Sequence, residues 1–371
     1  MDNSLVDVYY NTKQLDNTGA DYRVVVSERS GGKSYDVKRG LLKHAYETGN
    51  KFAYIRRWKD EVTQTAILQY FDDMVVDDEG NERIREITNN EYDCIDVYAQ
   101  QIFFAKIDDT GKKIRGAQIG NAFCLVRQTK TKSRSFVRYD RAVFEEFITD
   151  EGYAPDELKL FKSVISTVFR RRKGIIYLVG NTLTPVCPYF NYWKLDVHSL
   201  KQGTITTIIH PTGEKDSSGA ELFVKVAVEY PEPTGKPSQL FFEDDKMIRT
   251  GAWDTREYPA LEGKLTDYDK RYIILFEYTQ FRFWLNVLID KEGNPFIYIY
   301  PSTKRTMTID KDMRVVSDRY SPSRRWTKRF SDFVTRYDKY VVDLLEREKV
   351  VFSDDLTGTN FYQCLHESGG I

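Results

Sequence analysis

The sequence is poor in the residues that build metal centres and disulfide frameworks. It has four cysteines and four histidines among 371 residues. Neither residue type shows a metal-ligand spacing such as Cys-x-x-Cys. We therefore interpret the cysteines as free thiols in a reducing compartment rather than as a zinc site.

Long apolar runs and an excess of one charge are missing as well. No apolar run is long enough to span a membrane, and the polar N-terminus, Met1–Ser4, lacks the basic region of a signal peptide. The 55 lysines and arginines balance the 56 aspartates and glutamates, so the formal net charge is −1. Any contact with nucleic acid must then come from a local basic patch.

A glycine-containing turn stands between a predicted strand and a predicted helix near the N-terminus. The apolar run Tyr22–Val26 is typical of a buried strand, and apolar residues at helical spacing follow until Gly49. Between them lies Ser27-Glu28-Arg29-Ser30-Gly31-Gly32-Lys33-Ser34. This strand–turn–helix context predicts a phosphate-binding loop, or P-loop.

The chemistry of such a loop assigns a role to each residue. Backbone N–H groups of Ser30, Gly31 and Gly32, aided by the helix dipole, would face the phosphates. Lys33 could reach the β- and γ-phosphates, and the Ser34 hydroxyl could ligate Mg²⁺. The alternative is an ordinary strand–helix turn with a solvated lysine.

Two adjacent glutamates form the second key feature. They end the apolar segment that begins at Arg141. A P-loop ATPase needs one carboxylate at a strand end to hold Mg²⁺ and another to orient the attacking water. Glu145 suits the first role and Glu146 the second, although a pair of exposed glutamates at a strand end is a common alternative.

Two further strand ends carry polar residues. The strand predicted at Lys51–Ile55 runs into Arg56, Arg57 and Lys59, at the place where open α/β sheets bind ligands. The alternative is a solvated strand end. The buried-type strand Ile175–Val179 delivers Asn181 to its carboxyl end, where a polar side chain can sense the γ-phosphate.

The amino-acid composition changes in the second half of the chain. Segments 211–219 and 231–237, rich in proline, glycine and polar residues, are typical of turns and linkers. We therefore predict a first domain at 1–206, a linker or lid region at 207–256, and a smaller domain at 257–371. Within this last domain, three long β-type runs predict an antiparallel meander: Tyr272–Phe276, Phe281–Ile289 and Phe296–Tyr300.

Several short motifs in this order resemble those of a known family. The chain is similar to the genome-packaging (DNA encapsidation) ATPases of small short-tailed phages, which are relatives of the large terminase subunits. The resemblance lies in Val26–Tyr35, Tyr54–Lys59, Phe144–Ile148, Thr167–Arg172, Gly180–Asn181 and Pro188–Phe190. It departs from the smaller relatives in having Ser27 where they have glycine and Glu145 where they have aspartate.

The resemblance implies an α/β fold with an N-terminal P-loop domain of the additional-strand catalytic-glutamate class. It also implies roles for single residues. Arg29 would lie near the phosphates, Arg170 would act as an arginine finger on a neighbouring subunit's ATP, and Lys132 would act across the same interface. Asn181 would couple hydrolysis to movement, and the basic residues after the second strand, chiefly Arg56 and Lys59, would lie near the DNA.

The C-terminal domain would resemble an α+β ribonuclease H-like nuclease. Nucleases of this kind need several carboxylates that converge on two metal ions. The central run Phe281–Ile289 carries none, and Asp290 stands at its end. We therefore expect a nuclease-dead domain that docks on the portal or its adaptor.

The function expected from these observations is that of an ATP-driven motor with Mg²⁺ as the metal. Its partners would be double-stranded DNA, other copies of the chain in a ring, and the capsid portal, directly or through a protein or RNA adaptor. It would work in the host cytoplasm, transiently at the procapsid portal, without a membrane. The alternatives are a helicase-like P-loop translocase and a non-catalytic assembly scaffold with a degenerate P-loop.

Overall fold

The computed structural model describes most of the chain. The described residues are 9–27, 31–126, 135–149, 152–170, 172–181, 187–195, 197, 200–215, 217–232, 258–279, 281–302, 309–333 and 335–369. They divide into two compact units, Met1–Thr149 with Tyr153–Trp253, and Asp254–Ile371 with Asp150–Gly152. Each unit contains one mixed sheet, so the chain is an α/β protein.

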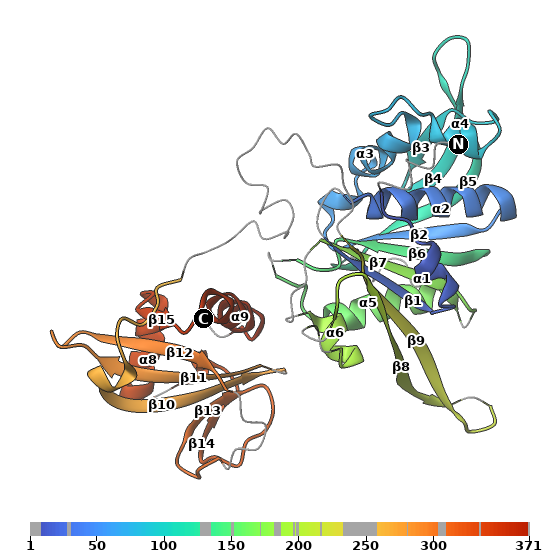
Figure 1. Cartoon of the computed structure of the whole chain (residues 1–371). Coiled ribbons are helices and arrows are strands. Elements are labelled where there is room, and N and C mark those ends of the chain that lie inside the picture. The colour runs from blue at the N-terminus through green and yellow to red at the C-terminus, as the bar shows by residue number, and fades with distance from the viewer. Residues whose placement is uncertain are drawn as a thin grey trace, which may run out of the picture. The chain divides into compact units, whose positions relative to one another are not determined.

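The first unit is built on a nine-stranded sheet in the order β3-β4-β5-β2-β6-β7-β1-β9-β8 (Figure 1). Six neighbouring strands, from β5 to β9 in that order, are parallel, whereas the pairs β3–β4, β4–β5 and β8–β9 are antiparallel. The strands are β1 Tyr22–Val26, β2 Lys51–Arg56, β3 Cys94–Tyr98, β4 Gln101–Ile107, β5 Lys113–Cys124, β6 Tyr139–Glu145, β7 Ile175–Gly180, β8 Thr204–Lys215 and β9 Glu221–Tyr230.

Helices cover both faces of this sheet (Figure 1). The α-helices are α1 Lys13–Asn17, α2 Lys33–Thr48, α3 Gln64–Val75, α4 Arg83–Ile87, α5 Glu157–Phe169 and α6 Pro188–Trp193, and a 3₁₀ turn, η1, spans Asp60–Val62. Leu41 of α2 and Phe71 of α3 belong to one core cluster, and Phe161 of α5 and Phe190 of α6 to another. Because the central strands are buried on both faces, they are nearly continuous apolar runs.

The parallel strands place the candidate motifs at one edge of the sheet. Carboxyl ends of neighbouring parallel strands meet at the same edge. The predicted P-loop follows β1 in the sequence, Glu146 follows β6 and Asn181 follows β7. One strand, β7, lies between β1 and β6. The strands predicted at Tyr22–Val26, Lys51–Ile55 and Ile175–Val179 are confirmed.

Residues 207–215 and 221–230, in the region expected from the sequence to be a linker or lid, are strands. They form most of the β8–β9 hairpin, which pairs with β1 through β9. Pro211 suggested a linker, but proline is tolerated on an edge strand such as β8 because no further strand needs its missing N–H. The rest of the predicted linker, 233–256, lies outside the described residues.

The second unit contains a six-stranded sheet in the order β14-β13-β10-β11-β12-β15. Its strands are β10 Asp269–Tyr278, β11 Phe281–Ile289, β12 Pro295–Pro301, β13 Arg314–Ser317, β14 Arg325–Thr327 and β15 Val350–Phe352. The antiparallel meander predicted from the sequence corresponds to β10–β11–β12 and is confirmed. The described residues of this unit also contain two 3₁₀ turns and two helices: η4 Leu265–Asp267, η5 Phe330–Asp332, α8 Arg336–Glu346 and α9 Asp355–Glu367.

Candidate functional site

The turn that follows β1 ends in a left-handed glycine. Gly32 has φ 86° and caps the N-terminus of α2. A Cβ at this position would lie 3.2 Å from the Cβ of Tyr9, so both the backbone conformation and the space favour glycine. Arg29 and Ser30 fall outside the described residues. The strand–turn–helix context predicted from the sequence is present.

Lys33 is the first residue of α2 and is buried, with 3% of its surface exposed. Its Nζ donates a hydrogen bond to the carbonyl oxygen of Ser27 at 3.1 Å. The backbone N–H of Ser27 in turn donates to the carbonyl of Gly180 at the end of β7. The lysine therefore lies under the turn, beside the end of β7, and not in solvent.

Ser34 and Glu145 come together from α2 and β6. The Ser34 hydroxyl donates to Oε2 of Glu145 at 2.9 Å, and the Tyr70 hydroxyl donates to Oε1 at 2.7 Å. Glu145 is 4% exposed. Burial raises the pKa of its carboxyl group, against the lowering effect of the two hydroxyl donors. A buried carboxylate beside a serine hydroxyl is a hard-oxygen donor set of the kind Mg²⁺ prefers.

Tyr70 of α3 is held in place by its own contacts. Its ring stacks on Tyr54 with centroids 4.4 Å apart. Lys38 of α2 lies over the same ring and donates to the Tyr70 carbonyl at 2.7 Å, while pairing with Asp73. Sequence reasoning missed Tyr70, since a tyrosine on an amphipathic helix carries no motif.

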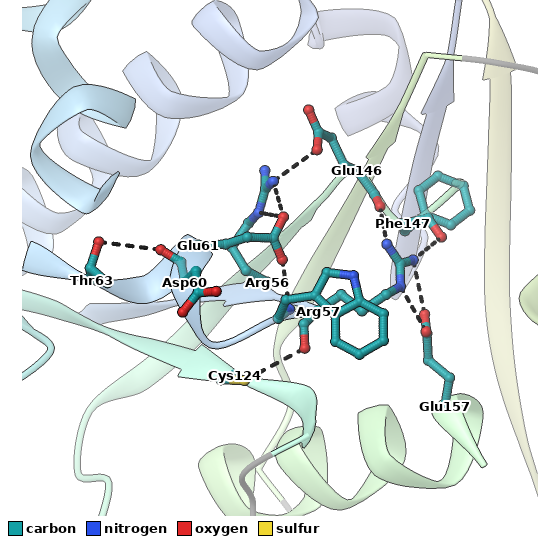
Figure 2. Close-up of polar contacts among 10 residues, drawn as sticks. Arg56, Arg57, Asp60, Glu61, Thr63, Cys124, Glu146, Phe147 and Glu157 are labelled. Atoms are coloured by element: carbon teal, nitrogen blue, oxygen red, sulfur yellow. Dashed lines mark hydrogen bonds and ion pairs between the residues drawn. The ribbon is translucent and has the colours of Figure 1, made fainter. Parts of the chain in front are cut away.

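Glu146 is exposed and has φ 53°, a left-handed conformation that turns the chain directly after β6. Its Oε2 accepts a hydrogen bond from Nη2 of Arg56 at 2.8 Å (Figure 2). The same guanidinium pairs with Glu61, which also accepts from the backbone of Trp58. Arg56 therefore bridges two carboxylates at the end of β2.

Arg57 lies in the interior, contrary to the prediction that it contacts DNA. It is 4% exposed, and its Nε and Nη2 donate to the carboxylate of Glu157 at 2.7 and 3.0 Å. Nη1 and Nη2 also donate to the carbonyls of Glu146 and Phe147 (Figure 2). Because these acceptors enclose the guanidinium, Arg57 positions the loop after β6 and does not reach solvent. Lys59, two residues further on, is exposed.

The remaining predicted site residues are spread around the same unit. Arg170 caps α5 in a left-handed conformation with φ 44° and is exposed. Arg172, two residues beyond Arg170, donates to the carbonyls of Phe169 and Val168 at the end of α5. Asn181 directly follows β7 and is half-buried. Lys132 falls outside the described residues.

Two features are absent from the residues that the structure describes. No cluster of three or more His, Cys, Asp or Glu side chains able to hold a metal ion occurs among them. No helix in the described part of the chain is long and apolar enough to cross a membrane.

The geometry defines an α/β protein with a glycine turn, a buried lysine and two adjacent glutamates at the carboxyl edge of a parallel sheet. Residues 1–205 match the family model described as Podovirus DNA encapsidation protein (Gp16). Since this match covers more than half of the 371 residues, the chain belongs to that family. The resemblance inferred from the short motifs is confirmed.

Individual relatives agree with this assignment. The DNA packaging protein of Bacillus phage B103 is 29% identical over 175 residues, which are 46% of this chain and 47% of the relative. The DNA packaging protein of Bacillus phage phi29 is 27% identical over 199 residues, 53% of this chain and 52% of the relative. The chain thus spans about half the length of the curated relatives it matches.

Solved structures are similar over nearly all of the chain. One of them is the bacteriophage Phi-29 viral genome packaging motor assembly, with a TM-score of 0.54 and 17% sequence identity, covering 98% of this chain and 100% of that one. At this identity the similarity shows a shared fold.

Proposed function

We propose that the chain is the ATPase of a DNA packaging motor, which couples ATP hydrolysis to the movement of double-stranded viral DNA into a preformed capsid. Membership of the encapsidation family supports this proposal. The single observation that carries it is the contact of Ser34 with Glu145, 2.9 Å apart, beside the buried Lys33. Residues from two distant parts of the sequence, Lys33-Ser34 and Glu145, meet where a P-loop ATPase needs them.

The first unit would be an additional-strand catalytic-glutamate ATPase domain. The position of β7 between β1 and β6 supports this class, because the P-loop strand and the glutamate strand are then separated by one strand. The domain would extend through β9, beyond the boundary at residue 206 expected from the sequence, since β9 pairs with β1.

The residues present fit a nucleotide and its metal ion. Backbone N–H groups of Gly31 and Gly32, with Lys33, would hold the phosphates, and the sequence adds Ser30 and Arg29 to this set. Ser34 and Glu145 would hold Mg²⁺, since hydroxyl and carboxylate oxygens are its preferred ligands. When bound, Mg²⁺ supplies positive charge that stabilises the charge developing on the γ-phosphoryl group.

Glu146 would orient and deprotonate the attacking water. A general base must lie within hydrogen-bond reach of the proton it takes. In this structure one of its oxygens accepts from Arg56. Oε2 would stay with Arg56, and the other carboxylate oxygen, Oε1, would take the proton of the attacking water.

Arg56 and Lys59 would contact DNA phosphates, whereas the buried Arg57 would not. A phosphate contact by Arg56 would compete with its ion pairs to Glu61 and Glu146. Phosphate contacts carry no base information, so binding would be independent of sequence.

The motor would be a homo-oligomeric ring at the capsid portal. Arg170, exposed at the end of α5, would act on the ATP of a neighbouring subunit, with Lys132 at the same interface. Asn181, at the end of the strand beside the P-loop strand, would couple hydrolysis to movement.

The second unit would be a ribonuclease H-like domain without nuclease activity that docks on the portal or an adaptor. A mixed sheet with helices α8 and α9 supports this fold. The Asp290 carboxylate accepts from the backbone N–H groups of Glu292 and Asn294 and from the Asn294 side chain. These contacts within the turn account for an aspartate at position 290 without a role in metal binding.

Two substitutions test the ATPase assignment. Lys33→Ala should abolish Mg–ATP binding, because the phosphates lose their fixed positive charge. Glu146→Gln should bind Mg–ATP near the parent affinity and lower turnover by about 10² or more, because only the water loses its base. Calorimetry and steady-state turnover measure the two effects. A Lys33→Ala protein that hydrolyses ATP at the parent rate would show that the P-loop is misassigned.

A further inference from the structure

A short N-terminal segment is fastened across the P-loop turn. The backbone N–H of Tyr10 donates to the carbonyl of Gly31 at 2.9 Å. Two residues on, the N–H of Thr12 donates to the Asp36 carboxylate in the first turn of α2 at 2.8 Å. The segment therefore contacts both the turn and the helix that would bind phosphate.

The side chain of Tyr10 anchors this segment to the sheet. Its hydroxyl donates to Oε2 of Glu229 at 2.6 Å. Tyr10 and Glu229 are 6% and 7% exposed, and the tyrosine ring packs among Leu15, Val25 and Ala227. Glu229 lies beside Val25 in the β1–β9 register, near the carboxyl end of both strands. The pair thus ties the turn to the strand next to the P-loop strand.

Burial of the Glu229 carboxyl group costs free energy that a packing role alone does not explain. Burial raises the pKa of its carboxyl group, and the hydrogen bond from Tyr10 lowers it only in part. Replacing a buried polar pair by apolar residues is often neutral or stabilising. A buried carboxylate at the ligand-binding edge of a sheet is therefore better explained by a role in positioning another residue.

Peptide geometry gives that explanation. The carbonyl of Gly31 and the N–H of Gly32 belong to one planar, trans peptide unit, so they point in opposite directions. When Tyr10 holds the Gly31 carbonyl on one side, the Gly32 N–H is directed to the other side. That N–H is among the groups that would face the phosphates.

We propose that Tyr10, anchored by Glu229, is a positioning residue that sets the direction of the Gly31–Gly32 peptide for nucleotide binding. This rests on the proposed function of the P-loop. The pair would affect how tightly the turn binds the phosphates in the ground state. It would not change the role of Glu146 in activating the water. Its loss should consequently raise KM and spare kcat.

Tyr10→Phe in the full chain tests the proposal. We expect Mg–ADP binding by calorimetry to weaken by about tenfold and the KM for ATP to rise similarly, with kcat within about twofold of the parent. Glu229→Met should give the same loss of affinity, and it should lower the unfolding temperature because the buried Tyr10 hydroxyl loses its acceptor. The double variant should be no worse than either single variant, since the two residues act as one unit.

Tyr177→Phe is the matched control. It also removes a buried hydroxyl from this region, but the described contacts of that hydroxyl are with Asp16 and Arg23 and not with the turn. Unchanged Mg–ADP affinity in both Tyr10→Phe and Glu229→Met, or an equal loss in Tyr177→Phe, would overturn the proposal. Lys33→Ala distinguishes failure of this proposal from failure of the P-loop assignment. If Lys33→Ala binds Mg–ADP like the parent, the P-loop assignment itself fails.

Discussion

At the scale of single residues, the candidate site depends on a carboxylate that is buried between two hydroxyl groups. Glu145 accepts from Ser34 and Tyr70, and burial raises its pKa. A raised pKa means that the folded chain binds the proton more tightly than the unfolded chain does. Ionisation of Glu145 therefore destabilises the folded chain. The free energy of unfolding falls as the pH rises from the unfolded-state pKa through the folded-state pKa.

Glu145→Gln should therefore stabilise the nucleotide-free protein at neutral pH and remove Mg²⁺-dependent ATP binding. The gain in melting temperature should shrink as the pH falls toward the unfolded-state pKa of about 4.3, where both states become protonated. Thermal unfolding across this pH range measures the effect, and Glu146→Gln, at an exposed carboxylate, should show no such gain. A Glu145→Gln protein that is less stable than the parent at neutral pH would contradict this account of the buried carboxylate.

The sequence predicted the glutamate pair and the loop but not the residues that hold them. Lys33, Ser34 and Glu145 belong to recognisable patterns, so their roles could be inferred from spacing and strand ends. Tyr70 and Tyr10 contribute through contacts with residues 75 and 219 positions away. Such contacts depend on how the helices and strands pack, and no local pattern encodes them.

At the scale of secondary-structure elements, Arg57 joins three parts of the first unit. It stands just after β2, pairs with Glu157 at the start of α5, and binds two carbonyls in the loop after β6. Its position after a strand end suggested a ligand contact, because sequence alone does not show which of two adjacent arginines faces inward. Burial of Arg57, and exposure of Lys59, separate the two roles.

Arg57→Met should destabilise the protein by about 3–5 kcal/mol, because it leaves the Glu157 carboxylate buried without its partner. Lys59→Met is the matched control and should leave the unfolding free energy unchanged within about 0.5 kcal/mol. It should instead lower the log–log salt slope of duplex DNA binding by about 0.9 for each DNA phosphate that Lys59 neutralises in the parent. Denaturant unfolding and DNA titrations at several salt concentrations measure both; an Arg57→Met variant as stable as the parent would contradict the structural role.

The strands that follow from apolar runs were easier to predict than the edge hairpin. Central strands such as β1 and β7 are buried on both faces and read as continuous apolar segments. The β8–β9 hairpin mixes exposed polar and apolar residues with Pro211 and Gly213, so it resembles a linker until its pairing with β1 is known.

At the scale of the whole molecule, the proposed ring predicts catalysis across subunits. Arg170 lies exposed at a helix end, where a local dipole contact would contribute less than about 1 kcal/mol. A finger acting on a neighbour's ATP would be worth about 10³–10⁵ in rate. Arg170→Ala should therefore keep its fold and ATP binding while turnover collapses.

Mixing variants distinguishes the two roles of Arg170. Arg170→Ala subunits mixed with Lys33→Ala subunits should recover some activity, because an intact Lys33 site can then meet an intact Arg170. The turnover of mixtures at several ratios provides the measurement. Parent-level turnover in Arg170→Ala alone, or mixtures that never exceed either variant, would place the finger elsewhere.

The most direct test of the central claim is ATP turnover by the full chain with and without double-stranded DNA. We predict that duplex DNA stimulates the parent, that Lys33→Ala and Glu146→Gln stay inactive, and that the DNA recovered with Mg²⁺ or Mn²⁺ is uncut. Equal stimulation by single strands would favour a helicase-like translocase, and metal-dependent cutting would assign nuclease activity to the chain. A parent chain that binds duplex DNA but never hydrolyses ATP would contradict the motor and indicate an assembly scaffold.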